Sequence, residues 1–305
     1  GDGNQTSIER DGSFPTAIVA PGGQRTSLEV DGNGYLESVT NEAGESWRMS
    51  HTAAGLLTSF TDPRGGERTM QYDAEGRLTR DANPAQGSWT IARAGAPGDE
   101  TVTLTSAEGR TQSYRTEDLP DGGERRTNTD AAGLVTTMTT DAGGTTTTAW
   151  PDGSTEVVVP DADPRWGMQS RFAKSITFRT PGGLTSTTTV ARSVELADPA
   201  NPLSGNFYED VRVNGRWYEW YHDRAANVGT YWTPLNRWAD EQYDGQGRTI
   251  SWTPNGLLGV QYGYDPKGRL TTITQGTRQA TIAYDTRNRP VTFTDAMQHS
   301  VTFGY

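Results

Sequence analysis

A tandem repeat of about 21 residues constrains the fold of this 305-residue chain more than any other feature. Residues of one repeat phase lie 21 apart at Gly34, Gly55 and Gly76, and again at Gly247 and Gly268, with Asn288 following after 20. A unit this short cannot bury an apolar face by itself and becomes stable only when it stacks on its neighbours. The period therefore predicts a linear array of small units and argues against one compact active site.

Each unit is predicted to contain two short strands and two turns. Apolar and polar residues alternate before the turn, as in residues 260–264, and a period of two is typical of a strand with one buried face. Tetrads such as residues 73–76 supply turn chemistry, because Asp accepts bonds from the following backbone and Gly adopts a positive φ. After the turn, Leu36 and Val39 lie three residues apart, which would place them on opposite faces of a regular strand. A bulge or burial on both faces would explain this spacing.

Composition favours an ordered β-protein over a disordered chain. Hydrophobic residues make up only 32%, but 9 Trp, 12 Tyr and 7 Phe exceed what disordered chains carry. Threonine is frequent and no stretch sustains a 3.6-residue period, so we expect strands and little helix. The formal charge of -11 disfavours nucleic acid as a partner, and the absence of cysteine excludes disulfides. No apolar run reaches the roughly 18 residues that a membrane-spanning helix needs.

The repeat pattern predicts three regions. Residues 1–160 form a repeat array that becomes degenerate after residue 83, and residues 243–305 form a second array. Residues 161–242 do not repeat and are read as a strand-rich, aromatic-rich insertion, in which Asn214-Gly215 marks a hairpin turn. Tyr305 lies 21 residues after Tyr284, where the next unit should begin, so we expect the second array to be truncated.

The best-preserved units carry a specific motif and resemble the RHS family, whose units are also called YD repeats. The motif residues are YDAEGRLT at 72–79, YDGQGR at 243–248, YDPKGRLT at 264–271 and YDTRNR at 284–289. The resemblance implies an all-β fold in which tandem hairpins form a curved, spiralling sheet, part of a hollow β-shell. In bacteria such a shell often encloses a C-terminal toxin, and related repeats occur in insecticidal toxin complexes and in the animal teneurins, where they serve adhesion.

The resemblance also implies a function for this chain. We expect a structural, non-enzymatic segment of an exported bacterial shell, secreted or at the cell surface, that encapsulates or delivers a C-terminal effector. Its partners would be the rest of its own chain or the enclosed domain, with self-association through open strand edges. The alternative is an adhesive or filament-forming surface protein that binds carbohydrate or protein. No cofactor is expected, and no segment matches the autoproteolytic core of the toxin members, so neither protease nor toxin activity carries over.

The candidate site residues fall into two groups. The repeat residues are expected to have structural roles, with each tyrosine hydroxyl bonded to a turn backbone or to the arginine after the glycine. They are Tyr72, Asp73, Gly76, Arg77 and Leu78; Tyr243, Asp244, Gly247 and Arg248; Tyr264, Asp265, Gly268, Arg269 and Leu270; and Tyr284 and Asp285. Candidate ligand-binding residues are Trp217, Trp220 and Trp232 of the insertion.

Titratable residues suggest no catalytic or metal centre. Carboxylates beside aromatic residues, as at Glu219 to Asp223, are what a glycosidase or sugar-binding site needs. Carboxylates two apart on a strand are equally typical of a solvated face, and we favour an aromatic cluster that fills the insertion. His51 occupies the tyrosine position of its repeat and is expected to fill it rather than to bind a metal. Asp161 and Asp163 lack the further oxygens and the glycine of a calcium loop.

Overall fold

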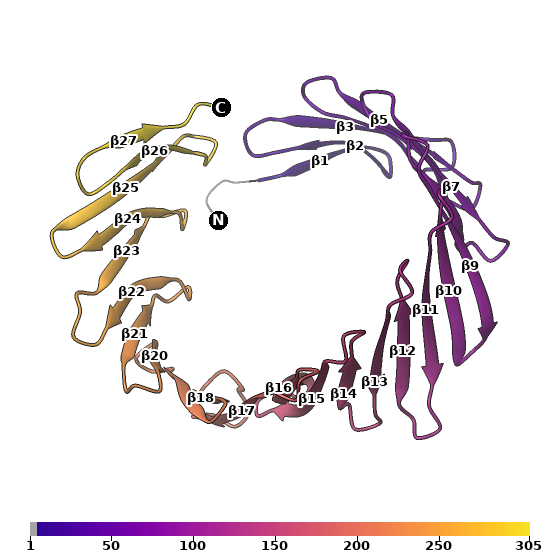
Figure 1. Cartoon of the computed structure of the whole chain (residues 1–305). Coiled ribbons are helices and arrows are strands. Elements are labelled where there is room, and N and C mark those ends of the chain that lie inside the picture. The colour runs from indigo at the N-terminus through magenta and orange to yellow at the C-terminus, as the bar shows by residue number, and fades with distance from the viewer. Residues whose placement is uncertain (1–4) are drawn as a thin grey trace. The chain divides into compact units, whose positions relative to one another are not determined.

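The structure, a computed structural model, describes residues 5–305 as β-strands joined by turns, without a helix (Figure 1). Hydrogen bonds join 27 strands of these residues into one sheet. The prediction of an all-β fold built from hairpins is therefore confirmed. Within the described part of the chain, no helix has the length and apolar character to cross a membrane.

The chain divides into two compact units. The first contains residues up to Leu119 together with Arg125–Thr137, and the second contains Pro120–Glu124 and Met138–Tyr305. The predicted region boundaries at residues 160 and 242 stay predictions. The strands up to the division are β1 (Ser7–Asp11), β2 (Phe14–Val19), β3 (Arg25–Val30), β4 (Leu36–Thr40), β5 (Ser46–His51), β6 (Leu57–Thr61), β7 (Glu67–Tyr72), β8 (Leu78–Ala82), β9 (Ser88–Ala96), β10 (Asp99–Ser106), β11 (Thr111–Asp118), β12 (Glu124–Thr129) and β13 (Val135–Thr140). The remaining strands are β14 (Thr146–Ala149), β15 (Thr155–Asp163), β16 (Gly167–Arg179), β17 (Thr185–Glu195), β18 (Asn206–Val213), β19 (Arg216–Asp223), β20 (Val228–Trp232), β21 (Trp238–Tyr243), β22 (Thr249–Pro254), β23 (Val260–Tyr264), β24 (Leu270–Gln275), β25 (Arg278–Tyr284), β26 (Pro290–Thr294) and β27 (Ser300–Thr302).

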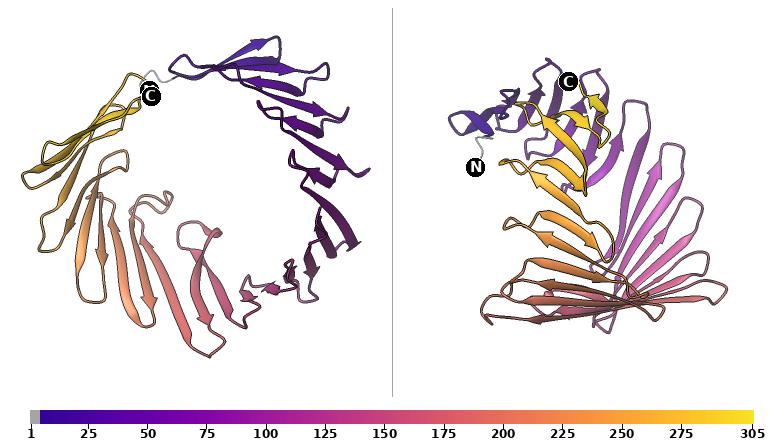
Figure 2. Two further views of the ribbon diagram at one scale, coloured as in Figure 1. Left: turned by 45° about the horizontal axis from the view of Figure 1, so that its top comes forward. Right: turned by 90° about the vertical axis from the view of Figure 1, so that its left-hand side faces the viewer.

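Each unit is an antiparallel meander in which strands pair with their neighbours in sequence. In the first unit β3 pairs with β4, β4 with β5, and so on to β11. In the second unit the same order runs from β14 to β27, so the non-repeating residues continue the sheet (Figure 2). Their β18–β19 hairpin closes with the predicted two-residue turn, where Asn214 and Gly215 have φ of 50° and 78°. The contacts that stabilise such a meander are short-range in sequence: they join adjacent strands or successive repeats.

Neither unit has a conventional buried core. Among the described residues, the only hydrophobic ones that are buried are Ala17, Phe207 and Ala239. Most of the alternating apolar residues of the described strands are half-buried instead, because each unit is a single layer of strands. Stability must therefore come from cross-strand pairs and from contacts that link one repeat to the next.

A bulge recurs in each repeat hairpin and explains the three-residue spacing in the sequence. In the β3–β4 pair, Glu29 lies opposite Ser38 but Val30 lies opposite Leu36, so Glu37 is an extra residue. The extra residue restores Leu36 and Val39 to one face, and of the two explanations considered the bulge is the right one. The same register shift occurs in the β5–β6, β7–β8, β21–β22, β23–β24 and β25–β26 pairs.

Candidate functional site

The aspartate of each YD motif organises its own turn. Asp265 donates its backbone N–H to the carbonyl of Arg269 over 3.0 Å and accepts the Gly268 N–H at its carbonyl over 2.9 Å. Its Oδ1 accepts the backbone N–H groups of Lys267 and Arg269 at 2.9 and 3.0 Å. Gly268 has a φ of 80°, the left-handed conformation that this three-residue hairpin loop requires. Asp73, Asp244 and Asp285 make the same set of bonds in their own turns.

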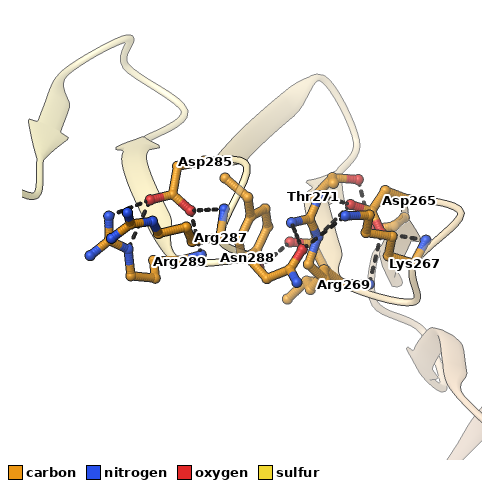
Figure 3. A network of polar contacts seen from close by, with 11 residues as sticks. Asp265, Lys267, Arg269, Thr271, Asp285, Arg287, Asn288 and Arg289 are labelled. Carbon is orange, nitrogen blue, oxygen red and sulfur yellow. Dashed lines mark hydrogen bonds and ion pairs between the residues drawn. The ribbon is translucent and has the colours of Figure 1, made fainter. Parts of the chain in front are cut away.

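The arginine of each of the three C-terminal motifs links one repeat to the next, whereas Arg77 pairs within its own turn, with Asp73 and Glu75. Arg269 Nε donates to Asp265 Oδ2 over 2.7 Å, and its guanidinium carbon lies 4.4 Å from the ring centroid of Tyr284 in the following repeat. Its Nη1 also donates to Asn288 Oδ1 over 2.8 Å, as Figure 3 shows. Arg248 over Tyr264 and Arg289 over Tyr305 repeat the arrangement at 4.7 and 4.4 Å. A cation held over a ring in this way contributes about 0.5–1 kcal/mol at an exposed site.

The tyrosine hydroxyl then reaches back to the preceding repeat. Tyr264 Oη donates to the carbonyl of Thr249 over 2.8 Å, and Tyr284 Oη donates to the carbonyl of Leu270 over 2.9 Å. Tyr72 and Tyr305 make the same bond to Leu57 and Pro290. Each acceptor comes immediately before the extra residue of a bulge, where the ladder of the sheet is interrupted. The tyrosine thus satisfies a carbonyl that the bulge sets apart, and it is this backbone group, not the motif arginine, that partners the hydroxyl.

At Gly55, Gly76 and Gly268 the turn glycine packs against the side chain that follows the glycine of the previous repeat, whereas a Cβ on Gly247 would meet nothing within 4 Å. A Cβ on Gly268 would lie 3.0 Å from Arg248 Nη1, and one on Gly76 would lie 3.4 Å from Leu56 Cδ1. A Cβ on Gly55 would lie 2.7 Å from the ring of Tyr35. These glycines are therefore required by their left-handed φ and, at Gly55, also by the close approach of the Tyr35 ring.

Degenerate repeats keep the arrangement with other side chains. Arg93 lies 21 residues after Tyr72, and its Nη1 donates to the carbonyl of Leu78 over 2.9 Å, which is the same contact that the tyrosines make. His51 occupies the preceding tyrosine position, and its ring lies 5.5 Å from that of Tyr35, which takes the arginine position. The chain thus replaces an arginine–tyrosine contact by a contact between two rings.

The turn geometry lowers the pKa of the motif aspartates. For Asp73, Asp244 and Asp285 the main cause is the backbone N–H of the motif arginine, and for Asp265 it is the arginine side chain. All four carboxylates are therefore ionised at neutral pH, which keeps both oxygens available as acceptors.

Tyr243 departs from the pattern and joins a cluster around Glu241. Glu241 Oε2 accepts the hydroxyls of Tyr231 and Tyr243 at 2.9 and 2.8 Å, and its Oε1 accepts Thr249 Oγ1 at 2.5 Å. Burial raises the pKa of Glu241, but the three hydroxyl donors outweigh it and leave the pKa below its usual value. Burial first, then Tyr231 and Glu241, raises the pKa of Tyr243. Both carboxylate oxygens of Glu241 are therefore occupied by hydroxyl donors, and the cluster is structural.

A second polar cluster surrounds Asp163, which is 2% exposed. Arg165 Nε lies 3.2 Å from Asp163 Oδ1 and Arg192 Nη1 lies 3.6 Å from Oδ2, while Arg192 Nε reaches Glu209 Oε2 over 2.6 Å. Burial raises the pKa of Asp163, but the arginines and the Arg165 N–H outweigh it and lower the pKa. Two carboxylates and two guanidinium groups compensate one another here, so the cluster is a paired structural network.

The three candidate tryptophans do not form one site. Trp220 alternates with Trp217 on β19, and Trp232 lies opposite Glu219, so Trp220 is on one face and the other two are on the opposite face. Trp217 Nε1 donates to Asp210 Oδ2 over 2.5 Å. Trp220 stacks on Tyr231 at 6.1 Å and meets Phe207 edge-on at 5.4 Å. Trp220 and Trp232 both line a cavity, and of the two it is Trp220 that alternation places on the face of the cavity.

That cavity has a volume of about 400 Å³ and lies on the face of β18, β19 and β20. The lining residues that alternation places on this face are Glu209, Val211, Tyr218, Trp220, Tyr231 and Thr233. Trp220 Nε1 and Thr233 Oγ1 are buried and have no hydrogen-bond partner within residues 5–305.

Burial lowers the pKa of the neighbouring His222, with Arg224 acting in the same direction, so this ring is neutral at pH 7.

The remaining candidate residues do not assemble into a reactive centre. Glu219 and Asp223 share a strand face that excludes Trp220 and His222, as their alternation predicts. In the described part of the chain, no group of three or more His, Asp or Glu side chains could hold a metal ion.

Comparison with known proteins agrees with this geometry. A family model described as the teneurin YD-shell matches residues 1–305. The crystal structure of TcdB2-TccC3-Cdc42 resembles 98% of the chain with 12% identity and a TM-score of 0.56, and TcdB2-TccC3 without its hypervariable C-terminal region gives 11% and 0.55. The chain spans 19% of the length of each of these proteins. Among curated protein sequences, no match was found.

Proposed function

Because this chain belongs to the teneurin YD-shell family, we propose that it is a structural segment of an exported shell that encloses or delivers a C-terminal effector. The observation that carries the proposal is the ladder that couples successive repeats: aspartate to arginine, arginine to the next tyrosine, and tyrosine to the bulge carbonyl. Each of these contacts holds successive repeats of the sheet together, and the side chains that form them present no reactive group. We call the sheet of repeats the wall of the shell. The partner of such a wall is the rest of its own chain, and its place is the secreted or cell-surface fraction of a bacterium.

The enclosure of an effector can be tested in the natural full-length polypeptide. Intact mass and peptide sequencing beyond Tyr305 should reveal a longer chain that ends in a domain without repeats. Limited proteolysis should then leave that domain uncut, and Gly268→Val should expose it because the turn of the wall is disrupted. Gly245→Val is the matched control, since a Cβ at Gly245 meets nothing within 4 Å. A chain without such a domain, or a domain cut equally fast in all three proteins, would refute the proposal.

A second candidate function, adhesion or self-association, is favoured by one edge of the second unit. Alternate turns of a meander lie at the same edge of the sheet, and those after β16, β20, β22 and β26 expose apolar side chains there. They are Leu184, Leu235, Leu257, Leu258 and Met297, each 70–77% exposed. Exposed apolar groups of this kind mark interaction surfaces. Leu257→Ser with Leu258→Ser should lower the mass measured by light scattering if the chain associates through this edge.

A further inference from the structure

A continuous groove runs from the face of the second unit to its apolar edge. The 400 Å³ cavity described above and a second cavity of about 670 Å³ share Tyr218 and Thr233 as walls. The second cavity continues to Arg216, at the start of β19, and to Leu235 and Arg237 in the turn after β20 at that edge. We call the two cavities together the aromatic groove.

The walls of the aromatic groove are flat and rigid at one end and cationic at the other. Tyr218 is 38% exposed, and Trp220 is held by its ring contacts with Phe207 and Tyr231. At the edge, the side chains of Arg216 and Arg237 form no ion pair or hydrogen bond within residues 5–305. Trp220 lies four positions after Arg216 on β19, which corresponds to about 13 Å along the strand.

Of the two glutamates that line the groove, Glu219 alternates to the other face of β19, and the carboxylate of Glu209 does not oppose an anionic ligand. Glu209 is paired with Arg192 over 2.6 Å, so its charge is compensated, and it lies opposite Trp220, away from the arginine end. The chain as a whole carries a charge of -11 and repels anions, so an anion in the groove depends on local cations. Arg216 and Arg237 are suited to this role because guanidinium groups bind carboxylates through paired N–H donors.

The position of the groove disfavours an extended peptide. The strands β18 to β21 already pair with one another along their length, so the groove offers no open strand edge. A peptide laid over aromatic rings would leave its own backbone groups unpaired, whereas strand addition needs a free edge. A sugar ring presents apolar C–H faces for stacking and keeps its hydroxyls at the periphery, where they reach water or the polar wall.

We propose that the aromatic groove binds a short oligosaccharide that carries a carboxylate. One sugar ring stacks in the section formed by Tyr218 and Trp220, and the carboxylate of the ligand pairs with Arg216 and Arg237. Glu209 and the unpartnered hydroxyl of Thr233 lie along the wall as hydrogen-bonding groups. The proposal is independent of whether the shell encloses an effector, because it concerns one groove on the second unit.

Titration calorimetry of the 305-residue chain with trigalacturonate tests the proposal. We expect saturable binding in the millimolar range or tighter, with quenching of tryptophan fluorescence because Trp220 lines the groove. The methyl ester of trigalacturonate keeps the rings and removes the charge, and should bind on the order of tenfold more weakly. Arg237→Gln should weaken trigalacturonate by a similar factor and leave the ester unaffected, and Tyr218→Ala should weaken both ligands.

Matched controls separate the groove from the rest of the surface. Tyr114→Ala removes a ring that is 42% exposed in the first unit, and Arg224→Gln removes an exposed arginine in the turn after β19; neither should change binding. Unchanged melting curves of all four variants show that each one folds. Absence of binding, equal binding of acid and ester, or loss of binding in the controls would overturn the proposal. Binding of a peptide of alternating Asp and Phe in place of the sugar would also overturn it and would identify a protein ligand.

Discussion

The repeats of the first unit and those near the C-terminus share a backbone but differ in the side chains that join them. In both regions the turn contains a glycine or asparagine of positive φ, and a bulge follows the turn. Near the C-terminus, an arginine over a tyrosine links each repeat to the next in three successive steps. In the first unit the arginine position holds Tyr35, then Leu56, and then Arg77, after which the next tyrosine position is taken by Arg93. The difference teaches that the backbone geometry defines the repeat, while any side chain of suitable size and shape can fill the junction.

The largest expected effect comes from breaking the backbone geometry in each region. Gly268→Val should lower the free energy of unfolding by roughly 2–4 kcal/mol, because it adds strain at positive φ and displaces Arg248. Gly76→Val should cost less, since its Cβ meets only an ordinary contact with Leu56. Urea unfolding followed by circular dichroism measures both. Equal destabilisation by Gly245→Val would show that the φ assignment is not responsible.

Removal of the tyrosine hydroxyl is the next largest effect, and it should be alike in the two regions. Tyr264→Phe and Tyr72→Phe each leave a bulge carbonyl without its donor, which costs about 1–2 kcal/mol. Tyr262→Phe is the control, because its hydroxyl has no partner within residues 5–305. If Tyr262→Phe is as costly as Tyr264→Phe in urea unfolding, the bond to the carbonyl contributes nothing.

Lowering the pH should destabilise turns that are held by an ionised aspartate, such as that of Asp265, but not the turn that is held by the uncharged Thr52. The folded-state pKa of Asp265 is lowered, so its stabilisation is complete above about pH 4 and is lost as the pH falls through that lowered value. Asp265→Asn should therefore be less stable than the parent at pH 7 and approach it as the pH falls. Thr52→Val removes the uncharged equivalent bond to the Leu56 N–H, and its deficit should not vary with pH. Thermal melts between pH 2 and 7, roughly the titration range of Asp, measure both.

The smallest effect should come from installing the C-terminal junction in the first unit. Leu56→Arg together with Thr52→Asp places an arginine–aspartate pair before Tyr72, which already bonds to the carbonyl of Leu57. We expect a gain of about 0.5–1 kcal/mol from the new contact over the tyrosine ring. The double variant and each single variant form a cycle, and no coupling between the two sites in urea unfolding would contradict the expected ladder.

The relative positions of the three candidate tryptophans could be predicted only in part from the sequence. Alternation along β19 separates Trp217 from Trp220, but only the pairing of β19 with β20 places Trp232 on the face away from Trp220. The groove could not be predicted, because Arg237 approaches Tyr218 through the pairing of neighbouring hairpins and not through any spacing in the chain. Likewise, the partner of Tyr264 lies at a bulge, and the sequence signalled this bulge only by the odd spacing of apolar residues.

The sequence by itself determined the unit of this protein: a 21-residue period, turns of Asp and Gly, and alternating strands that identify a YD-type array. These features are local, since φ preferences and strand alternation act over a few residues. The tertiary structure alone decided how units are joined, because the contact of Arg269 with Tyr284 and the bond of Tyr284 to Leu270 depend on register and bulge position. A shift of one residue in that register would turn these side chains to the other face of the sheet.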